Sequence, residues 1–372
     1  MDRGEPLKIK AQGHMDFPML LTILLLCAFG IVMVFSASYY WAQHYQGDGY
    51  YYIKKQLQFL AIGIVVMLVA SRVNYRFLDK MKWYIVGVSI AMLVAVLIFG
   101  VERNGGKRWF EIAGISIQPS EIAKFAMTLW MAAFMSRRAA LMKSFARGVV
   151  PMLMVMLLVC GLILLQPNLS MAVSIGMIGM AMLFVGGAKS KHLMLLLVAA
   201  AGAFVLLVLA ADYRIDRVTI FLDPWKDEKD KGYQLIQSLY ALGSGGIFGT
   251  GLNYSRQKLL YLTYGESDFI FSIIGEELGW IGGVCVIAAY LFLIYRGVRV
   301  AMRCKDHFGS LLAVGITVTL AVQVMVHIGV VTSSIPPTGQ TLPFISAGGS
   351  SLVVYLAQMG VLLNISREAH SP

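Results

Sequence analysis

Long apolar stretches recur along almost the whole of this 372-residue chain. The first, residues 17–39, has no charged side chain, and about 20 apolar residues in a row suffice for a helix that crosses a bilayer. Charged residues make up only 14% of the chain, against about 25% in soluble domains. The pattern excludes an ordinary water-soluble enzyme. It also excludes a membrane β-barrel, whose strands alternate in hydrophobicity over about ten residues, and it predicts an all-α polytopic membrane protein.

We predict about ten transmembrane helices, with the N- and C-termini both cytoplasmic. The sidedness comes from Lys and Arg, which favour cytoplasmic loops and concentrate before the first span and after every second one. Two polar connections and a stretch rich in Pro and Gly then lie outside, at 102–120, 212–267 and 333–349. The predicted spans are 17–39, 57–71, 83–101, 121–136, 148–165, 170–187, 192–211, 268–295, 309–332 and 350–366.

No separate soluble domain is expected. The longest polar interval, 212–267, is too short and too poor in apolar residues to bury a core of its own. We therefore expect one integral domain over residues 1–372, with 212–267 as a large extracellular loop between helices 7 and 8. The net charge of +11 follows the membrane topology and does not indicate a nucleic acid partner. The four scattered cysteines lack a CxxC spacing, so neither a zinc site nor a disulfide framework is predicted.

An acidic residue stands at the outer start of the eighth predicted span. Asp268 opens the sequence DFIFSIIGEELGWIGG, and Glu276 lies two turns deeper, where an unpaired carboxylate is expensive. Ser272 follows Asp268 at a spacing of four, so the two share one helix face. We expect this face to be a polar seam rather than a lipid-facing surface. An acidic residue at a helix start can also serve only to complement the helix dipole, and the sequence does not choose between these interpretations.

Basic residues near the outer face are the second candidate group. Glu121 and Lys124, at the start of the fourth span, have the i, i+3 spacing of an ion pair, which would only stabilise the fold. The competing hypothesis is that Lys124, or the nearby Lys107 and Arg108, binds an anionic substrate from the outer leaflet. Two further arginines on the same side of the membrane are Arg214 and Arg217.

Glycine and proline concentrate in two outer segments. The sequence GYQLIQSLYAL at 232–242 has the apolar spacing of a helix, and five glycines follow between 243 and 251. Such a run permits backbone amides to approach a ligand such as a pyrophosphate, or provides a hinge between two helices. The stretch 333–349 is predicted to be re-entrant or to line a cavity wall, because irregular backbone at membrane depth must be buried in protein. His327, just before it, is interpreted as a packing residue.

Together these segments resemble the SEDS family (shape, elongation, division and sporulation) of bacterial membrane proteins, which comprises FtsW, RodA and SpoVE. The resemblance extends over essentially the whole chain. It rests on KRWFEIAGISIQPSEIAK at 107–124, FLDPW at 221–225, GYQLIQSLYALGSGGIFGTGL at 232–252, SDFIFSIIGEELG at 267–279, and the PPTGQTLPFIS and GGSS blocks. The forms IGEELG and VVT are more similar to the FtsW and SpoVE branch. The sequence departs from the family pattern at Asn168, usually Asp, at His327, usually Asn, and at Ala347, usually Tyr.

The resemblance implies a peptidoglycan glycosyltransferase in the bacterial cytoplasmic membrane that polymerises lipid II at the outer face, in cell division or sporulation. The implied partners are lipid II, a class B penicillin-binding protein with transpeptidase activity, other divisome proteins and membrane lipid. The family's presumed catalytic aspartate maps onto Asp268, where a carboxylate can deprotonate the acceptor sugar hydroxyl. The substrate-binding residues expected beside it are Glu121, Lys124, Lys107, Arg108, Arg214, Arg217, Ser272 and Glu276.

Two alternative functions use the same sequence features. A transporter that flips lipid-linked precursors would also need intramembrane carboxylates and a cavity between helices. A non-catalytic scaffold for the transpeptidase would tolerate loss of the carboxylate. A divalent cation, Mg²⁺ or Mn²⁺, is a candidate cofactor, although a single outer Asp does not specify one.

Overall fold

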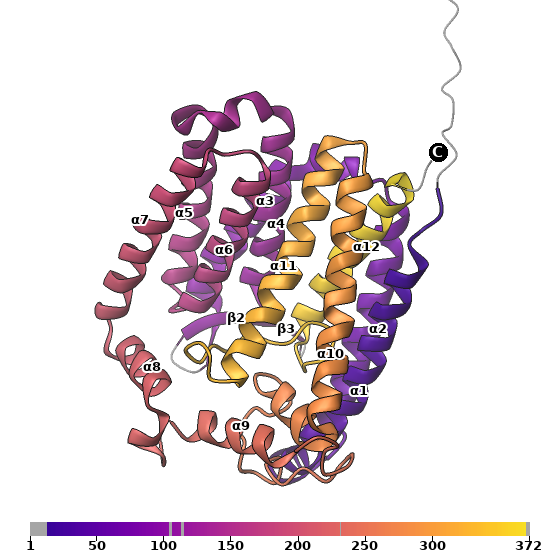
Figure 1. The fold of residues 1–372 in the computed structure, drawn as a ribbon, viewed down its shortest axis with the longest axis vertical. Helices are drawn as coiled ribbons and strands as arrows, with labels where there is room; N and C mark the ends of the chain where they lie inside the picture. Colours follow the sequence, from indigo (N-terminus) through magenta and orange to yellow (C-terminus); the bar gives the residue numbers. More distant parts are fainter. Residues whose placement is uncertain (1–12, 104–105, 113–114, 231, 370–372) are drawn as a thin grey trace, which may run out of the picture.

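The structure is a computed structural model that describes residues 13–103, 106–112, 115–230 and 232–369. Long helices run side by side between two ends of the molecule (Figure 1). Each of the ten predicted spans coincides with one helix. They are α1 (Phe17–Gln46), α2 (Tyr51–Arg72), α3 (Arg76–Phe99), α4 (Pro119–Arg137), α5 (Val150–Leu164), α6 (Leu169–Val185), α7 (Ser190–Leu209), α10 (Ile270–Arg303), α11 (His307–Val331) and α12 (Ser350–Ala369).

The predicted ends were wrong by more than a turn at four places. α1 continues to Gln46, α2 begins at Tyr51, α3 begins at Arg76 and α10 continues to Arg303, because polar residues extend these helices past their apolar runs. The connection before α5 also forms short helical turns, Ala139–Lys143 and Phe145–Val149. Apolarity marks the part of a helix that faces lipid, while the hydrogen-bonded helix itself continues into the interface.

Within the described residues, seven helical segments are long and apolar enough to cross a membrane by themselves. They are α1, α2, α3, Phe145–Leu164, α7, α10 and α11. Of the other predicted spans, α6 has only 17 residues, while α4 and α12 carry polar side chains and have most of their residues buried. These polar residues face protein rather than lipid. The chain is thus a multi-pass helical membrane protein, and the count of ten crossings remains a prediction.

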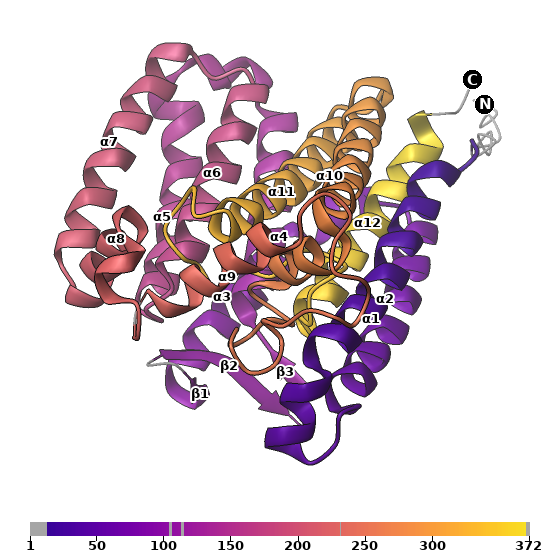
Figure 2. The same cartoon turned by 60° about the horizontal axis from the view of Figure 1, so that its bottom comes forward.

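The first and last described helices begin and end at the same end of the molecule. Asp16, which caps α1, pairs with Arg296 at 2.6 Å between Oδ2 and Nη2. At the same end, Arg76 Nη2 lies 2.5 Å from Glu368 Oε1. The connections predicted to be cytoplasmic therefore gather around both chain ends, opposite the strands, α8 and α9 (Figures 1 and 2). The basic residues predicted before the first span lie outside the described residues.

The polar connections at the other end contain secondary structure that the sequence analysis missed. Residues 102–120 form a three-stranded antiparallel sheet in the order β1 (Val101–Arg103), β2 (Gly106–Ile112) and β3 (Ile115–Ile117). The loop 212–267 contains α8 (Asp212–Leu222), the 3₁₀ turn Pro224–Asp227 and α9 (Tyr233–Ser244). Of these only α9 was predicted from apolar spacing, and it buries Leu235, Ile236 and Ala241.

A break in α10 explains the glycine-rich segment. Gly279 has φ 66° and ψ −165° inside α10, which interrupts the helical hydrogen bonds on both sides. Residues 246–251 replace them: Thr250 N donates to Glu276 O at 2.9 Å, and Trp280 N donates to Gly246 O at 2.9 Å. Side chains are excluded at this contact, because a Cβ at Gly249 would lie 2.2 Å from Glu277 O. The glycines therefore bring the loop backbone against the α10 backbone, a role that neither the pyrophosphate nor the hinge interpretation included.

Candidate active site

Asp268 lies in the turn immediately before α10. Its backbone N donates to Tyr264 O at 3.1 Å, and the helix N-cap is Phe269, with no side-chain cap. The Asp268 carboxylate therefore does not cap the helix. It is partly buried, and it faces the irregular segment after α11, since a Cβ at Gly339 would lie 3.3 Å from Asp268 Oδ2.

Burial has the largest effect on the pKa values of the two carboxyl groups in this turn. It raises the pKa of Asp268 to about 6, against a hydrogen bond from Ser267 and the positive charge of Arg217, which both lower it. Glu266, two residues earlier, is buried, and burial together with the charge of Asp268 raises its pKa to about 7. Carboxyl groups with pKa values near neutrality can take up and release protons under working conditions.

Two of the predicted cationic residues lie near each other, and one of them, Arg217, is near enough to Asp268 to lower its pKa. Arg217, on α8, reaches the segment that faces Asp268, and its Nη1 donates to Pro337 O at 3.4 Å. Arg108, on β2, donates to Gln166 O at 2.9 Å and to Pro167 O at 2.6 Å. Burial, and next the charge of Arg217, lower the pKa of Arg108. Two guanidinium groups thus contribute positive charge at the loop end of the bundle.

The other two outer cations are placed differently. Arg214 is turned toward the end of α7, where Nη1 donates to Leu207 O at 2.7 Å and Nε donates to the Tyr213 hydroxyl at 2.8 Å. Lys107 lines a shallow cavity of 200 Å³ beside the sheet, together with Glu102 and Gln166. The structure does not bring either side chain to Asp268, and their assignment to substrate binding stays a prediction.

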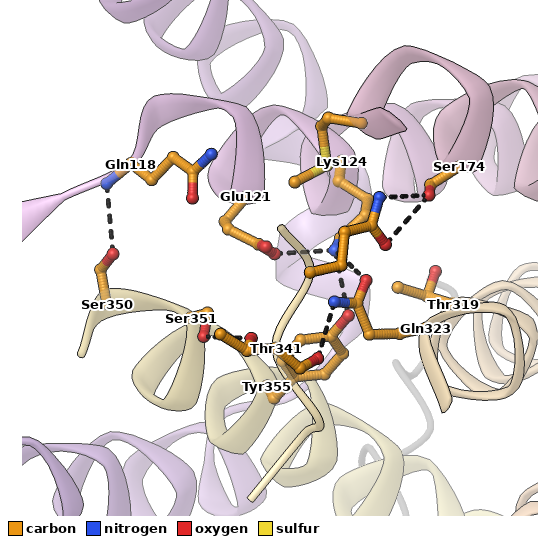
Figure 3. Close-up of polar contacts among 12 residues, drawn as sticks. Gln118, Glu121, Lys124, Ser174, Thr319, Gln323, Thr341, Ser350, Ser351 and Tyr355 are labelled. Atoms are coloured by element: carbon orange, nitrogen blue, oxygen red, sulfur yellow. Dashed lines mark hydrogen bonds and ion pairs between the residues drawn. The ribbon is translucent and has the colours of Figure 1, made fainter. Parts of the chain in front are cut away.

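Lys124 is the centre of a buried polar cluster between α4, α11 and α12 (Figure 3). Its Nζ lies 2.7 Å from Glu121 Oε2, and the two side chains are only 1% and 4% exposed. The same ammonium donates to Gln323 Oε1 at 3.2 Å and to the Tyr355 hydroxyl at 3.0 Å. The predicted ion pair is present. A substrate can reach this lysine only if the protein that covers it moves.

The irregular segment 336–343, which we call the strap, joins Asp268 to the Lys124 cluster. Gly339 faces Asp268, and two residues later Thr341 O accepts from Gln323 Nε2 at 2.9 Å. Gln340 packs toward α6, where its Nε2 donates to Ser174 Oγ at 2.8 Å. The stretch has no regular secondary structure over these residues; Gln340, Leu342 and Pro343 are buried, whereas Gly339 is exposed. Its interpretation as a re-entrant or wall segment stays a prediction.

Ser272 and Glu276 are occupied by the outer loop. Ser272 is fully buried, with its hydroxyl 2.7 Å from that of Ser238 on α9. Glu276 accepts from the Ser255 hydroxyl at 2.5 Å and from Arg256 N at 2.8 Å. Their predicted contact with substrate stays untested, and in this arrangement both side chains hold α9 and residues 255–256 on α10.

Known proteins resemble this chain in both sequence and fold. A family model described as cell cycle protein, which groups FtsW, RodA and SpoVE, matches residues 17–371. The chain belongs to the FtsW/RodA/SpoVE family. Stage V sporulation protein E of Bacillus subtilis is 44% identical over 95% of this chain and 97% of its own length. A probable peptidoglycan glycosyltransferase FtsW of Geobacter metallireducens is 38% identical over 98% of both.

Solved structures of the FtsW/RodA/SpoVE family share this fold. A chain from a peptidoglycan synthase complex, described as coordinating polymerization and crosslinking, superposes with a TM-score of 0.79 and 27% identity. The match covers 96% of this chain and 99% of that one. RodA of Thermus thermophilus superposes with a TM-score of 0.68 and 26% identity, over 99% of this chain and all of RodA.

The sequence analysis did not predict that Lys258 is buried in an ion pair. Its Nζ lies 2.9 Å from Glu277 Oε1, and the two side chains are 1% and 0% exposed. It also donates to Ser36 on α1 at 3.1 Å and to Asn253 at 2.6 Å. A lysine in a polar loop gives no sign of burial. The only available signal was the second carboxylate of the EE pair in α10, which needs a cationic partner at that depth.

Proposed function

We propose that this chain is a peptidoglycan glycosyltransferase that polymerises lipid II at the outer face of the cytoplasmic membrane. The observation that carries the proposal is Asp268, a partly buried carboxylate at the loop end of the bundle with its pKa raised to about 6. The names of its relatives, probable peptidoglycan glycosyltransferase FtsW and Stage V sporulation protein E, support the same activity.

The proposed chemistry assigns one role to each kind of group. Asp268 takes the proton from the acceptor sugar hydroxyl as that oxygen attacks the anomeric carbon of the donor. The bond from that carbon to the undecaprenyl pyrophosphate breaks at the same time, and negative charge grows on the departing phosphate. Arg217 and Arg108 supply fixed positive charge near this end of the molecule, which stabilises such a leaving group.

A class B penicillin-binding protein is the proposed partner, together with other divisome proteins. The structural neighbour belongs to a complex described as coordinating polymerization and crosslinking, and crosslinking is the chemistry of a transpeptidase. The described residues offer no soluble interaction domain. We therefore propose that the partner docks through membrane helices and the outer loop, with cell division or sporulation as the setting.

A divalent cation would have to enter with the substrate. Among the described residues, no group of three or more His, Cys, Asp or Glu side chains could hold a metal ion together. Mg²⁺ is commonly held by one or two carboxylates plus the phosphates of a substrate. Asp268 and the lipid II pyrophosphate would form such a set.

The test is glycan polymerisation from purified lipid II by the protein with and without its transpeptidase. We expect Asp268→Asn to fold, insert and bind the partner, and to lose about 100- to 10,000-fold in turnover, the usual contribution of a general base. The control is Asp48→Asn, the same chemical change at an exposed carboxylate paired with Lys54 in the α1–α2 connection. Its turnover should equal that of the parent.

The two alternatives give different results in the same preparation. A flippase would move lipid II across a vesicle bilayer and make no glycan. A scaffold would leave Asp268→Asn fully functional with the partner. Polymerisation by Asp268→Asn within a few-fold of the parent would refute the catalytic assignment.

A further inference from the structure

Side chains of other elements hold the strap, residues 336–343, over most of its length, while Leu342 O accepts from the backbone N of Ser346 at 3.0 Å. The strap has no strand or helix of its own, so its carbonyl oxygens need partners from elsewhere. Pro337 O accepts from Arg217, Gln340 O contacts His327 Nδ1 at 2.8 Å, and Thr341 O accepts from Gln323. The His327 contact is the one nearest to Gly339, the residue that faces Asp268.

The chemistry of this contact fixes the tautomer of His327. A carbonyl oxygen can only accept a hydrogen bond, so Nδ1 must carry the proton and donate it. Nε2 then presents a lone pair, and it has no hydrogen-bond partner among the described residues. The ring is 1% exposed. Its single polar contact is therefore the bond to the strap.

We propose that His327 is a positioning residue for glycosyl transfer: its Nδ1–H donates to Gln340 O and thereby holds Gly339 against Asp268. The inference rests on the proposed function. The strap leaves little room beside the carboxylate, with a Cβ at Gly339 only 3.3 Å from Asp268 Oδ2. A shift of the strap by about 1 Å changes the position and the solvation of Asp268, and misplacement of that size can cost about 100-fold in rate.

Two substitutions separate this role from simple packing. His327→Asn places an amide nitrogen at the same number of bonds from Cα as Nδ1, so it keeps the donor and loses ring volume. His327→Leu keeps apolar volume and loses the donor. If the histidine only fills space, Leu should be tolerated better than Asn, because a cavity is costly in a packed interior. If it donates to the strap, the order is reversed.

The experiment measures kcat and KM for lipid II polymerisation by the parent and both variants, after each has been shown to be monodisperse in detergent. We expect His327→Asn to stay within about 3-fold of the parent. For His327→Leu we expect a kcat loss of about 10- to 100-fold with little change in KM. The acid limb of its pH profile should also move to lower pH, because a loosened strap lets water reach Asp268.

An independent measurement covers the case in which His327→Leu does not fold. The nitrogen NMR spectrum of ¹⁵N-histidine-labelled parent, assigned by difference against His327→Asn, reports which ring nitrogen is protonated. Protonation at Nδ1 is expected. Protonation at Nε2, or equal activity of the folded Leu and Asn variants, would overturn the inference. A parent that makes no polymer would refute the proposed function instead, without bearing on the tautomer.

Discussion

Replacing Lys258 with methionine should release the outer loop from α10 without unfolding the bundle. The three N–H donors of the Lys258 ammonium group match three acceptor oxygens, on Glu277, Ser36 and Asn253. Both side chains of the Lys258–Glu277 pair are at most 1% exposed. Methionine fills most of the volume and leaves the Glu277 carboxylate buried without its cation. Removing one partner of a buried pair costs about 3–5 kcal/mol, which corresponds to a factor of about 100 to several thousand in an equilibrium constant at 1.36 kcal/mol per tenfold.

The assay is amide hydrogen exchange over residues 253–258 in detergent micelles or nanodiscs. The amides of Ser255 and Arg256 donate to Glu277 and Glu276, so their protection reports directly on docking of the loop. We expect protection to fall by about 100-fold or more in Lys258→Met, with exchange in α4 and α11 unchanged.

Two further variants make this prediction refutable. Lys258→Met combined with Glu277→Gln should regain most of the lost protection, because the stranded charge is gone. Lys54→Met breaks the exposed pair with Asp48, whose side chains are 65% and 41% exposed, and solvent screening leaves such a pair little effect on stability. Protection in Lys54→Met should equal that of the parent. The reasoning is wrong if Lys258→Met exchanges within a few-fold of the parent, or if the double variant is as exposed as the single one.

Three other predictions concern the active-site region. Glu121→Gln or Lys124→Met alone should lower the yield of folded protein more than the two substitutions together, because each single change leaves a buried charge without its partner. A double variant that folds but is inactive would indicate that Lys124 contacts substrate. Polymerisation should rise as pH increases through about 6, where Asp268 loses its proton, and Arg217→Ala should move this limb to higher pH by removing the cation that lowers the pKa, as read from kcat profiles. Gly249→Ala should destabilise the protein by about 1–3 kcal/mol in thermal or denaturant unfolding, since its φ is +81° and its Cβ would meet Glu277 O.

The glycine prediction has an internal control six residues earlier. Gly243 lies within α9, and a Cβ there meets no atom within 4 Å. Gly243→Ala should therefore be neutral or slightly stabilising, because alanine favours a helix by up to about 1 kcal/mol. If Gly243→Ala and Gly249→Ala unfold alike, close backbone contact is not what the glycine-rich segment provides.

Apolar stretches were sufficient to predict the long helices, because most of them carry this signal within about 20 consecutive residues. The sheet was missed because β1 and β3 have three residues each, too few for an alternating pattern to register. α8 was missed because its eleven residues mix charged and apolar side chains, which reads as polar loop. These elements exist because the bundle holds their ends, and that support is not encoded locally.

The residues of the candidate site also differ in whether the local sequence signals them. Asp268, Glu121 and Lys124 were identified as candidates because a charge inside or beside an apolar run is conspicuous in sequence. The strap's neighbours were not, since Gly339 and Asp268 are 71 positions apart in the sequence and nothing in either segment specifies the pairing. Gly279 lies within an apolar stretch, and only its backbone angles show that it breaks α10. In sequence, a glycine that interrupts a helix looks the same as one that lets two helices pack closely.

The two buried lysines have similar exposure and different consequences for the fold. Lys124 pairs with Glu121 one turn away on its own helix, so the pair forms as soon as α4 forms and adds little information about which helices meet. Lys258 pairs with Glu277 on another element and with Ser36 on a third. That charge is neutralised only when the outer loop, α1 and α10 have all assembled. At Lys258, formation of the ion pair and docking of the outer loop are therefore one equilibrium. The interaction that neutralises the buried lysine also orders the loop that precedes Asp268.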